Sequence, residues 1–216
     1  MKPKSRQKRA GNAMGDWEKL LSAQVIIQDK FPECVLVGGT ADADHVHPDL
    51  KRRFAEILRR VEAEAGWTTA RVEPPVLLLG HFRGVRTGIR QLFRSKPLET
   101  TTIRGLCVPT VEEMLRSKAI LIVRRNTTRD FIDFVALMDH LGMERCLRAL
   151  ESLDRLYPQT EKGAVRRQLA LQLAEPKPWD LSQTDLRKYK ALKEPYTDWK
   201  EIMRRAIAIA QRIVEG

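Results

Sequence analysis

The sequence predicts an α+β protein with a small sheet near its N-terminal end and a helical C-terminal half. Apolar residues recur three and four apart over residues 16–31, which is typical of an amphipathic helix. Residues 67–103 are rich in Val, Thr, Ile, Leu and Phe and are broken by prolines and glycines, as expected for three or four strands joined by turns. After Pro109 the helical spacing returns. A helix, then strands, then a run of helices indicates the α+β class.

The N-terminal elements have recognisable boundaries. Asp16 is a suitable N-cap for the first helix, and Pro32 stops its pattern. The short apolar run at 34–37 leads into two glycines, as expected for a buried strand that enters a tight turn. Pro48 opens a second amphipathic helix that Gly66 ends. Within the strand-rich part we expect a hairpin.

The C-terminal half is predicted to be helical almost throughout. Thr110 followed by Glu113 forms a capping-box pattern ahead of a helix, and residues 126–128 separate that helix from the next, which ends near Gly142. The remainder is helical apart from an irregular proline-rich segment, residues 175–179. We therefore expect a basic flexible arm over 1–15, a mixed α+β domain over 16–105 and a helical domain over 106–216.

The composition indicates which partners the protein binds and in which compartment it occurs. The formal net charge is +11, and basic residues without acids crowd the first ten positions, which favours polyanionic partners such as nucleic acid or nucleotides. No apolar run approaches the roughly 20 residues that span a bilayer, so we expect a soluble, cytoplasmic protein with no membrane partner. The three cysteines are far apart and predict buried thiols.

A pair of carboxylates follows the glycine turn. On a strand, Asp42 and Asp44 would point to the same face, where they repel each other unless a cation lies between them. Mg²⁺, or Mn²⁺, commonly uses one or two carboxylates plus substrate phosphates, and glycines such as Gly38 and Gly39 let backbone amides approach a triphosphate. The pattern favours nucleotide handling, although a solvated loop has the same composition.

Two histidines beside these carboxylates leave a second metal hypothesis open. Asp42, Asp44, His45 and His47 could together bind a transition metal and serve a hydrolase. Hydrogen-bonded or solvated histidines are the simpler interpretation.

Charged residues also interrupt the first two C-terminal helices. Lys118 stands at an apolar helix position, where a lysine either snorkels or meets an anion. Arg129 and Asp130 begin the next helix, and Asp133 lies one turn along on nearly the same face. First-turn stabilisation explains Asp130 but not Asp133, which is a candidate for a group aimed into a site.

The order of these motifs carries a family resemblance. Val35-Leu-Val-Gly-Gly-Thr-Ala41, the Asp-x-Asp, Glu113-Met-Leu-Arg-Ser-Lys118 and Arg129-Asp-Phe-Ile-Asp133 follow one another in the chain. Over roughly residues 16–142 the sequence resembles the AbiEii/AbiGii nucleotidyltransferase toxin family, a branch of the polymerase-β-like fold found in abortive-infection and toxin–antitoxin systems. The resemblance implies transfer of a nucleoside monophosphate from an NTP to an RNA acceptor, with the tRNA 3′ end as the expected acceptor and a cognate antitoxin as a further partner.

The resemblance also implies roles for individual residues. Metal binding falls to Asp42 and Asp44. The catalytic residues it implies are Asp42, Asp44, Lys118 and Asp133. The nucleotide-binding residues it implies are Gly38, Gly39, Thr40, Lys118, Arg129 and Asp130.

One interval departs from the family pattern. The family places a short helical stretch between the glycine turn and the strand that carries Asp-x-Asp, whereas here only Thr40 and Ala41 intervene. Two extended residues reach about 7 Å, which we expect to be too short to leave one strand and return on its neighbour. Either the chain lacks a segment here or the site is broken. The runner-up hypothesis is therefore a catalytically impaired protein of the same fold that binds nucleic acid or a partner protein.

Overall fold

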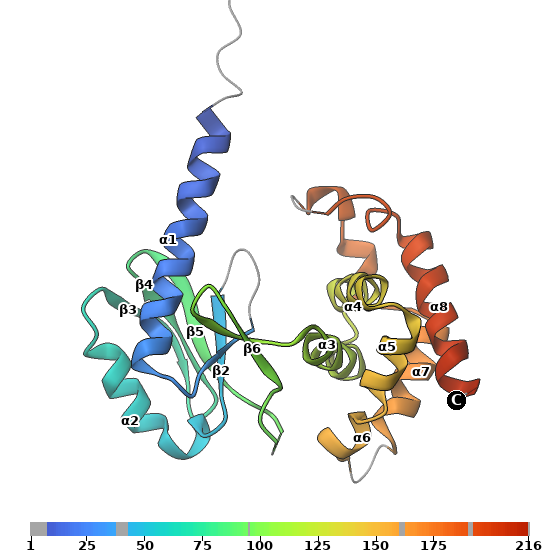
Figure 1. Cartoon of the computed structure of the whole chain (residues 1–216), viewed down its shortest axis with the longest axis horizontal. Coiled ribbons are helices and arrows are strands. Elements are labelled where there is room, and N and C mark those ends of the chain that lie inside the picture. Colours follow the sequence, from blue (N-terminus) through green and yellow to red (C-terminus); the bar gives the residue numbers. More distant parts are fainter. Residues whose placement is uncertain (1–7, 38–42, 95, 160–162, 190–191, 216) are drawn as a thin grey trace, which may run out of the picture. The chain divides into compact units, whose positions relative to one another are not determined.

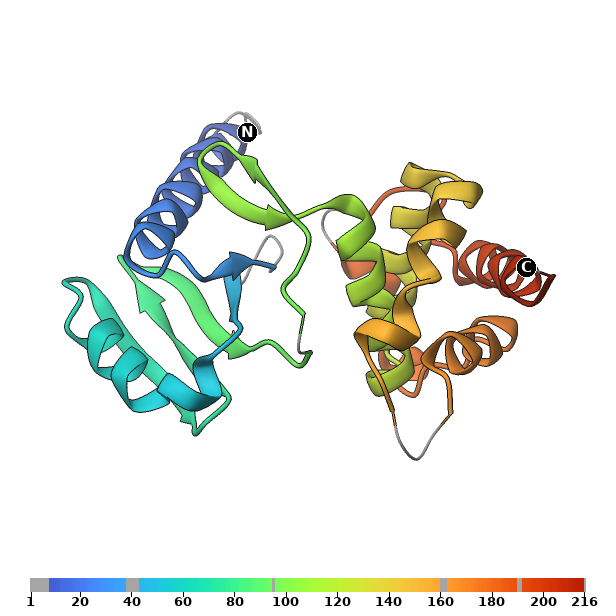
Figure 2. The same cartoon turned by 60° about the horizontal axis from the view of Figure 1, so that its bottom comes forward.

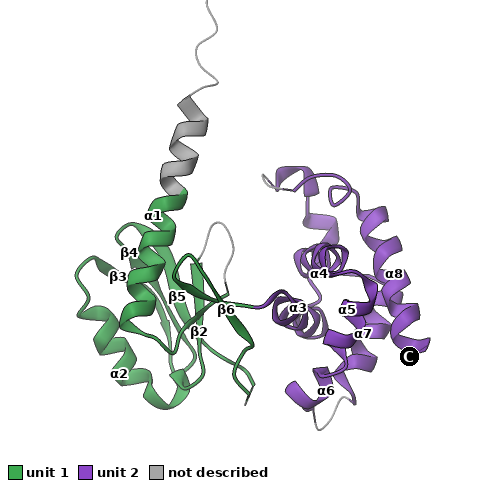
Figure 3. Cartoon of the chain, viewed as in Figure 1, with its two compact units in different colours: residues 1–109 green, residues 110–216 purple. Residues whose placement is uncertain are grey.

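The chain folds into two compact units that divide between Pro109 and Thr110 (Figure 3). The computed structural model describes residues 8–37, 43–94, 96–159, 163–189 and 192–215, with side chains from residue 17 onward. Unit 1 contains the sheet and unit 2 is helical. The observed architecture is therefore α+β with a mixed sheet and a helical C-terminal half, as the sequence predicts.

Unit 1 is built on a five-stranded mixed sheet in the order β1-β2-β5-β4-β3 (Figure 1). Its strands are β1 (Val35–Leu36), β2 (Ala43–His47), β3 (Trp67–Glu73), β4 (Leu77–Phe82) and β5 (Val85–Gln91). The pairing of β2 with β5 is parallel, and the other pairings are antiparallel. The expected hairpin is present as β4 and β5, and its turn uses positive φ angles at Arg83 and Gly84.

Two helices cover one face of this sheet (Figure 2). They are α1 (Lys8–Lys30) and α2 (Leu50–Glu62). Ile27 and Phe31 of α1 and Ile57 of α2 share one buried core with Leu78 and Ile89 of the sheet. Because side chains alternate along a strand, every other residue of β4 and β5 faces this core.

The first helix starts earlier than the sequence predicted. It begins at Lys8, whereas a flexible arm over 1–15 and a helix from Asp16 were expected. Alanines at positions 10 and 13 have the highest helix propensity, which offsets the cost of the two glycines in this stretch. Residues 1–7 lie outside the described chain.

A second hairpin leads out of unit 1. Its strands are β6 (Thr100–Ile103) and β7 (Leu106–Pro109), which form a two-stranded sheet. The Gln28 side chain of α1 fixes this hairpin: its Nε2 donates to the Cys107 carbonyl at 2.8 Å, and its Oε1 accepts from the Cys107 N–H at 2.7 Å. One side-chain amide therefore satisfies both backbone groups of Cys107.

Unit 2 is a bundle around a single apolar core. Its α-helices are α3 (Val111–Arg125), α4 (Thr128–Leu141), α5 (Met143–Leu150), α6 (Leu153–Leu156), α7 (Val165–Ala174) and α8 (Trp199–Glu215). Two 3₁₀ turns, η1 (Leu181–Gln183) and η2 (Leu186–Lys188), precede α8. Phe131 and Phe134 of α4 are fully buried, and Phe131 meets Trp199 edge to face with ring centroids 6.0 Å apart.

The helix start predicted at Thr110 is confirmed. The Thr110 hydroxyl accepts from the Glu113 N–H at 3.2 Å, while the Glu113 carboxylate pairs with Arg116 at 3.1 Å inside the unit. Within the described part of the chain, no helix is both long and apolar enough to cross a membrane.

Replacing Gln28 by Leu should destabilise unit 1. The substitution keeps the volume but leaves the N–H and carbonyl of Cys107 without their partner, and each unsatisfied buried group costs about 1 to 3 kcal/mol. Urea unfolding should show this loss for Gln28→Leu, while Gln183→Leu, at an exposed position of unit 2, should change stability by less than about 0.5 kcal/mol. Equal stability of the two variants would show that the two hydrogen bonds between Gln28 and Cys107, the Gln28 clamp, do not stabilise unit 1.

Candidate active site

Asp44 is positioned by a strand that returns directly beside its predecessor. β1 and β2 pair antiparallel, and the Val37 N–H donates to the Asp44 carbonyl at 2.8 Å. The prediction that the interval is too short for such a return is wrong, because an antiparallel neighbour needs only a turn and no crossover. Four of the predicted site residues, Gly38, Gly39, Thr40 and Asp42, lie outside the described residues.

The Asp44 carboxylate lies on the sheet face opposite the helices. Asp44 is in register with Gly88 of β5, one position from the core residue Ile89, so its side chain points away from α1 and α2. Its Oδ2 accepts from the Arg90 Nε at 2.8 Å, and the side chain is 20% exposed. The Asp44 Oδ2 thus takes part in an ion pair on a partly exposed face of the sheet.

Gly88 lies beside this carboxylate in a crowded place. A Cβ at position 88 would overlap the Leu79 side chain, lie 2.7 Å from the Leu78 carbonyl oxygen and lie 3.2 Å from the Asp44 Oδ1. Sequence reasoning missed both Gly88 and Arg90 as neighbours of Asp44. Their proximity follows from the parallel β2–β5 pairing, which joins segments more than forty residues apart and leaves no local signal.

His45 and His47 face the opposite way from Asp44. His45 is in register with Ile89, and both histidines are buried, with 0% and 1% exposure. The His47 Nδ1 accepts from the Asp49 N–H at 2.9 Å. Burial lowers the pKa of His45 to about 4 and also lowers the pKa of His47.

This arrangement overturns the transition-metal hypothesis. Asp44 and the two histidines cannot converge on one ion because they lie on opposite faces of one strand. Within the described residues, no group of three or more His, Cys, Asp and Glu side chains could hold a metal.

A second group of predicted residues comes together in unit 2, at the junction of α3 and α4. The Lys118 Nζ lies 2.6 Å from the Asp133 Oδ2 and 3.7 Å from the Asp130 Oδ1. The Arg129 Nε lies 3.8 Å from the same Asp133 oxygen. Lys118 is therefore neither a free snorkelling side chain nor a buried lone charge, because two carboxylates of the next helix hold its ammonium.

The two acids of this cluster have different surroundings. Asp130 is only 1% exposed and also accepts from the Thr127 hydroxyl at 2.7 Å and from the Arg125 Nη2 at 3.0 Å. Asp133 is 35% exposed. Asp130 thus fixes the corner between the helices, while Asp133 and the cations beside it remain accessible to an anionic ligand.

The structure accordingly divides the predicted residues between the units. Lys118, Arg129, Asp130 and Asp133 form one cluster in unit 2, and Asp44 with its Arg90 partner belongs to unit 1.

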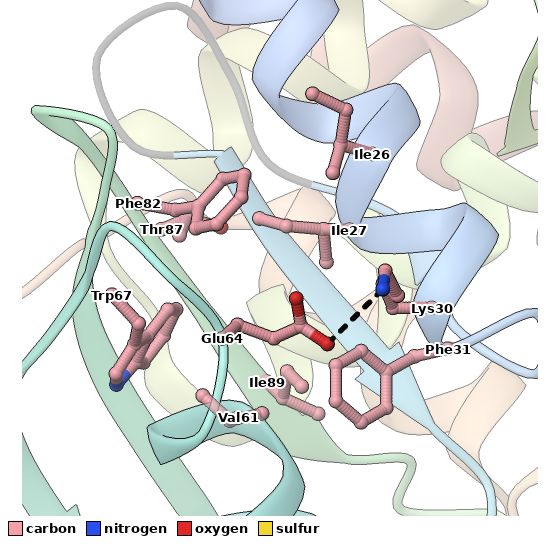
Figure 4. A pocket seen from close by; sticks show the side chains of 10 residues that line it. All are labelled: Ile26, Ile27, Lys30, Phe31, Val61, Glu64, Trp67, Phe82, Thr87 and Ile89. Carbon is pink, nitrogen blue, oxygen red and sulfur yellow. Dashed lines mark ion pairs between the residues drawn. The ribbon is translucent and has the colours of Figure 1, made fainter.

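Unit 1 also contains a small cavity, on the sheet face opposite Asp44 (Figure 4). Its volume is about 10 Å³, and Ile27, Phe31 and Ile89 are among the side chains around it. Lys30 and Glu64 form an ion pair at its rim, with Nζ and Oε1 3.5 Å apart. The cavity has room for about one water molecule and lies on the helix-covered face, so it is a gap in core packing.

Comparisons with known proteins give a fold and no family. No family model matches the chain. The heme uptake protein MmpL11 of Mycobacterium tuberculosis is 32% identical over 133 residues, and the mycolic acid-containing lipids exporter MmpL11 of Mycolicibacterium smegmatis is 33% identical over 129 residues. Each match involves 56% of this chain but spans only 13% of the length of the curated relative, and it transfers no activity to this chain.

Two solved structures match nearly the whole chain. A proposed nucleotidyltransferase from H. pylori superposes with a TM-score of 0.55 at 15% identity, covering 94% of this chain and 95% of that protein. JHP933 from Helicobacter pylori gives 0.53 at 15% identity, with coverage of 94% and 92%. The chain has a nucleotidyltransferase-like fold. Membership of the AbiEii/AbiGii branch stays a prediction.

The buried His45 predicts an acid-sensitive unit 1. Its folded pKa of about 4 lies below the ordinary value of 6.5, so the stability is complete above about pH 6.5 and falls as the pH drops toward 4, because the unfolded chain takes up the proton first. The loss approaches about 3 kcal/mol. We expect the stability difference between the wild type and His45→Leu, from urea unfolding, to shift by this amount between about pH 7 and pH 4. A difference that does not change with pH would contradict the assignment.

Proposed function

We propose that this chain is a metal-dependent nucleotidyltransferase of the toxin–antitoxin type that transfers NMP from an NTP to an RNA acceptor, with the tRNA 3′ end as the acceptor. The observation that carries the proposal is the accessible Asp44 carboxylate on the open sheet face of a nucleotidyltransferase-like fold. The net charge of +11 supports polyanionic substrates. A cytoplasmic location and a cognate antitoxin belong to the same proposal.

The donor set of the sheet suits a metal ion that arrives with the nucleotide. Asp44 offers hard carboxylate oxygens, and Asp42 would add a second carboxylate two positions earlier on the chain. Mg²⁺ or Mn²⁺ bound in this way uses one or two protein carboxylates and completes its shell with phosphates and water. When bound, the ion would neutralise charge on the reacting phosphate.

Arg90 would change partners when nucleotide binds. Its guanidinium pairs with Asp44 in the free protein and its side chain is 44% exposed, so it can move to a phosphate oxygen as the carboxylate takes up the ion. Gly38, Gly39 and Thr40 would border the triphosphate, as the family resemblance implies.

The family resemblance implies further roles for the cluster in unit 2. Lys118 and Arg129 would bind phosphate oxygens in exchange for part of their contact with Asp133. Asp133, released from Lys118, would accept the proton of the attacking hydroxyl at its carboxylate oxygen, while the hydroxyl oxygen bonds to the α-phosphorus of the NTP and pyrophosphate leaves. Asp130 would hold Lys118 and the corner of the helices throughout, because it is buried and has further donors.

A specific observation favours a second function. The Arg90–Asp44 ion pair occupies the carboxylate that a metal requires. A catalytically impaired protein of this fold, which binds nucleic acid or a partner protein, would keep such a pair permanently.

Asp44→Asn should abolish nucleotide transfer with little change in stability, because it removes a charged ligand from a partly exposed site. The measurement is incorporation of label from each of the four α-labelled NTPs into total tRNA with Mg²⁺. Asp49→Asn is the matched control, since Asp49 is an exposed acid of the same unit that pairs with Arg52. Label that persists in Asp44→Asn would discard the assignment, and no label with the wild type would select the impaired alternative.

Lys118→Met should raise the NTP concentration needed for half-maximal transfer about tenfold, because one charge-assisted contact to phosphate contributes roughly 1.5 to 3 kcal/mol. Initial rates at varied NTP would measure it. Lys188→Met serves as control, since Lys188 is 83% exposed and pairs only with Asp185 among its described ion pairs. Wild-type NTP dependence in Lys118→Met would make Lys118 a purely structural partner of α4.

A further inference from the structure

The proline-rich segment between α7 and η1 alternates buried and exposed side chains. Pro176 and Pro178 are buried, whereas Lys177 and Trp179 are exposed. The Trp179 indole is 65% exposed, an unusual placement for the largest apolar side chain. The prolines thus anchor the segment, and the lysine and the indole project from it.

Hydrogen bonds fix this tryptophan on the end of α3. The Trp179 Nε1 donates to the Arg125 carbonyl at 3.0 Å, and its backbone N–H donates to the Asn126 carbonyl at 3.2 Å. The Asn126 Nδ2 in turn donates to the Lys177 carbonyl at 2.8 Å. One edge of the indole is therefore tied to the protein.

The next residue fastens the segment to α4. The Asp180 Oδ1 accepts from the Thr128 N–H at 2.7 Å and from the Thr128 hydroxyl at 2.8 Å, so it satisfies a donor of the first turn of that helix. The Trp179 side chain is thus held by its Nε1, and its backbone is held at residue 179 and at the next residue. An exposed aromatic side chain fixed in this way loses little conformational entropy when a ligand covers it.

This corner is continuous with the predicted site in unit 2. Arg125 receives the indole N–H at its carbonyl and pairs with Asp130 through its Nη2, and Asp130 lies 3.7 Å from the Lys118 Nζ. Exposed cations surround the corner; they are Arg124, Arg125, Arg129 and Lys177. Acidic side chains balance them in part, since Lys177 pairs with Glu175 and Arg129 lies near Asp133.

We propose that Trp179 is a stacking platform for an unpaired base of a single-stranded RNA, which holds the strand end beside Lys118 and Asp133. An exposed, immobilised ring among cations is the arrangement by which proteins bind single strands, because every base has a face to stack and every nucleotide a phosphate to pair. The inference rests on the proposed function and extends it, since it assigns the acceptor strand a contact outside the residues of the family motifs.

Binding of a short labelled single-stranded RNA, followed by fluorescence anisotropy, tests the platform. Trp179→Ala should weaken binding about tenfold, because the base loses the ring on which it stacks. Trp179→Phe keeps a ring and should recover most of the affinity. Leu171→Ala removes a side chain of the same unit that is 64% exposed and should bind as the wild type does.

Tryptophan emission provides a readout that does not depend on how well the alanine variant folds. RNA stacked on Trp179 should quench part of the emission of the wild-type chain, and this part should be missing in Trp179→Phe. Unchanged affinity in Trp179→Ala, identical quenching in wild type and Trp179→Phe, or no RNA binding by the wild type would each overturn the inference.

The transferase assay separates this inference from the proposed function. Transfer of label to tRNA with a KM for tRNA that Trp179→Ala leaves unchanged would overturn the platform and leave the enzyme. RNA binding that depends on Trp179, without any transfer by the wild type, would support the platform and remove the enzyme.

Discussion

The parallel pairing of β2 with β5 is the constraint on which unit 1 depends. It places β2 between a short antiparallel neighbour, β1, and the β4–β5 hairpin. The Thr87 hydroxyl donates to the Ala43 carbonyl at 2.6 Å and reinforces the start of the pairing inside the core. From that register follow two opposite environments on one strand: His45 is enclosed against Ile89, and Asp44 stands over a glycine beside Arg90. A shift by one residue would exchange the two environments.

In unit 2, several ion pairs and hydrogen bonds meet at the corner between α3 and α4. Asp130 is the shared acceptor there, because Lys118, Arg125 and the Thr127 hydroxyl all reach it. A buried carboxylate is tolerated only with such partners. The same corner receives Trp179 and Asp180 from a segment about fifty residues later. The charged side chains of α3 and α4 and the irregular segment thus meet at one corner. The contact between them joins residues far apart in the chain, so local sequence patterns do not predict it.

Local patterns in the sequence predicted much of the fold and part of the candidate site. Helical spacing identified most helices of both halves, and the cap at Thr110 is present as predicted. The irregular segment before α8 is longer than the predicted 175–179, because only two 3₁₀ turns interrupt it. Lys118 and Asp133 could be predicted as candidate site residues, but not as an ion pair. They lie together because the consecutive helices α3 and α4 pack against each other. The β2–β5 register, the Arg90 contact and the anchoring of Trp179 could not be predicted, because each joins residues whose distance along the chain hides them from periodicity. The start of α1 at Lys8 could not be predicted from periodicity, because its first turns carry no repeating apolar face.

The Gln28 clamp has a consequence for how unit 1 meets other chains. A strand edge with free N–H and carbonyl groups is a template on which further strands assemble. At Cys107 both groups are already engaged by a side-chain amide that imitates a peptide unit. At the edge of the β6–β7 sheet, the Gln28 amide therefore takes the place that the peptide group of a neighbouring strand would occupy. It protects that edge from sheet extension and aggregation.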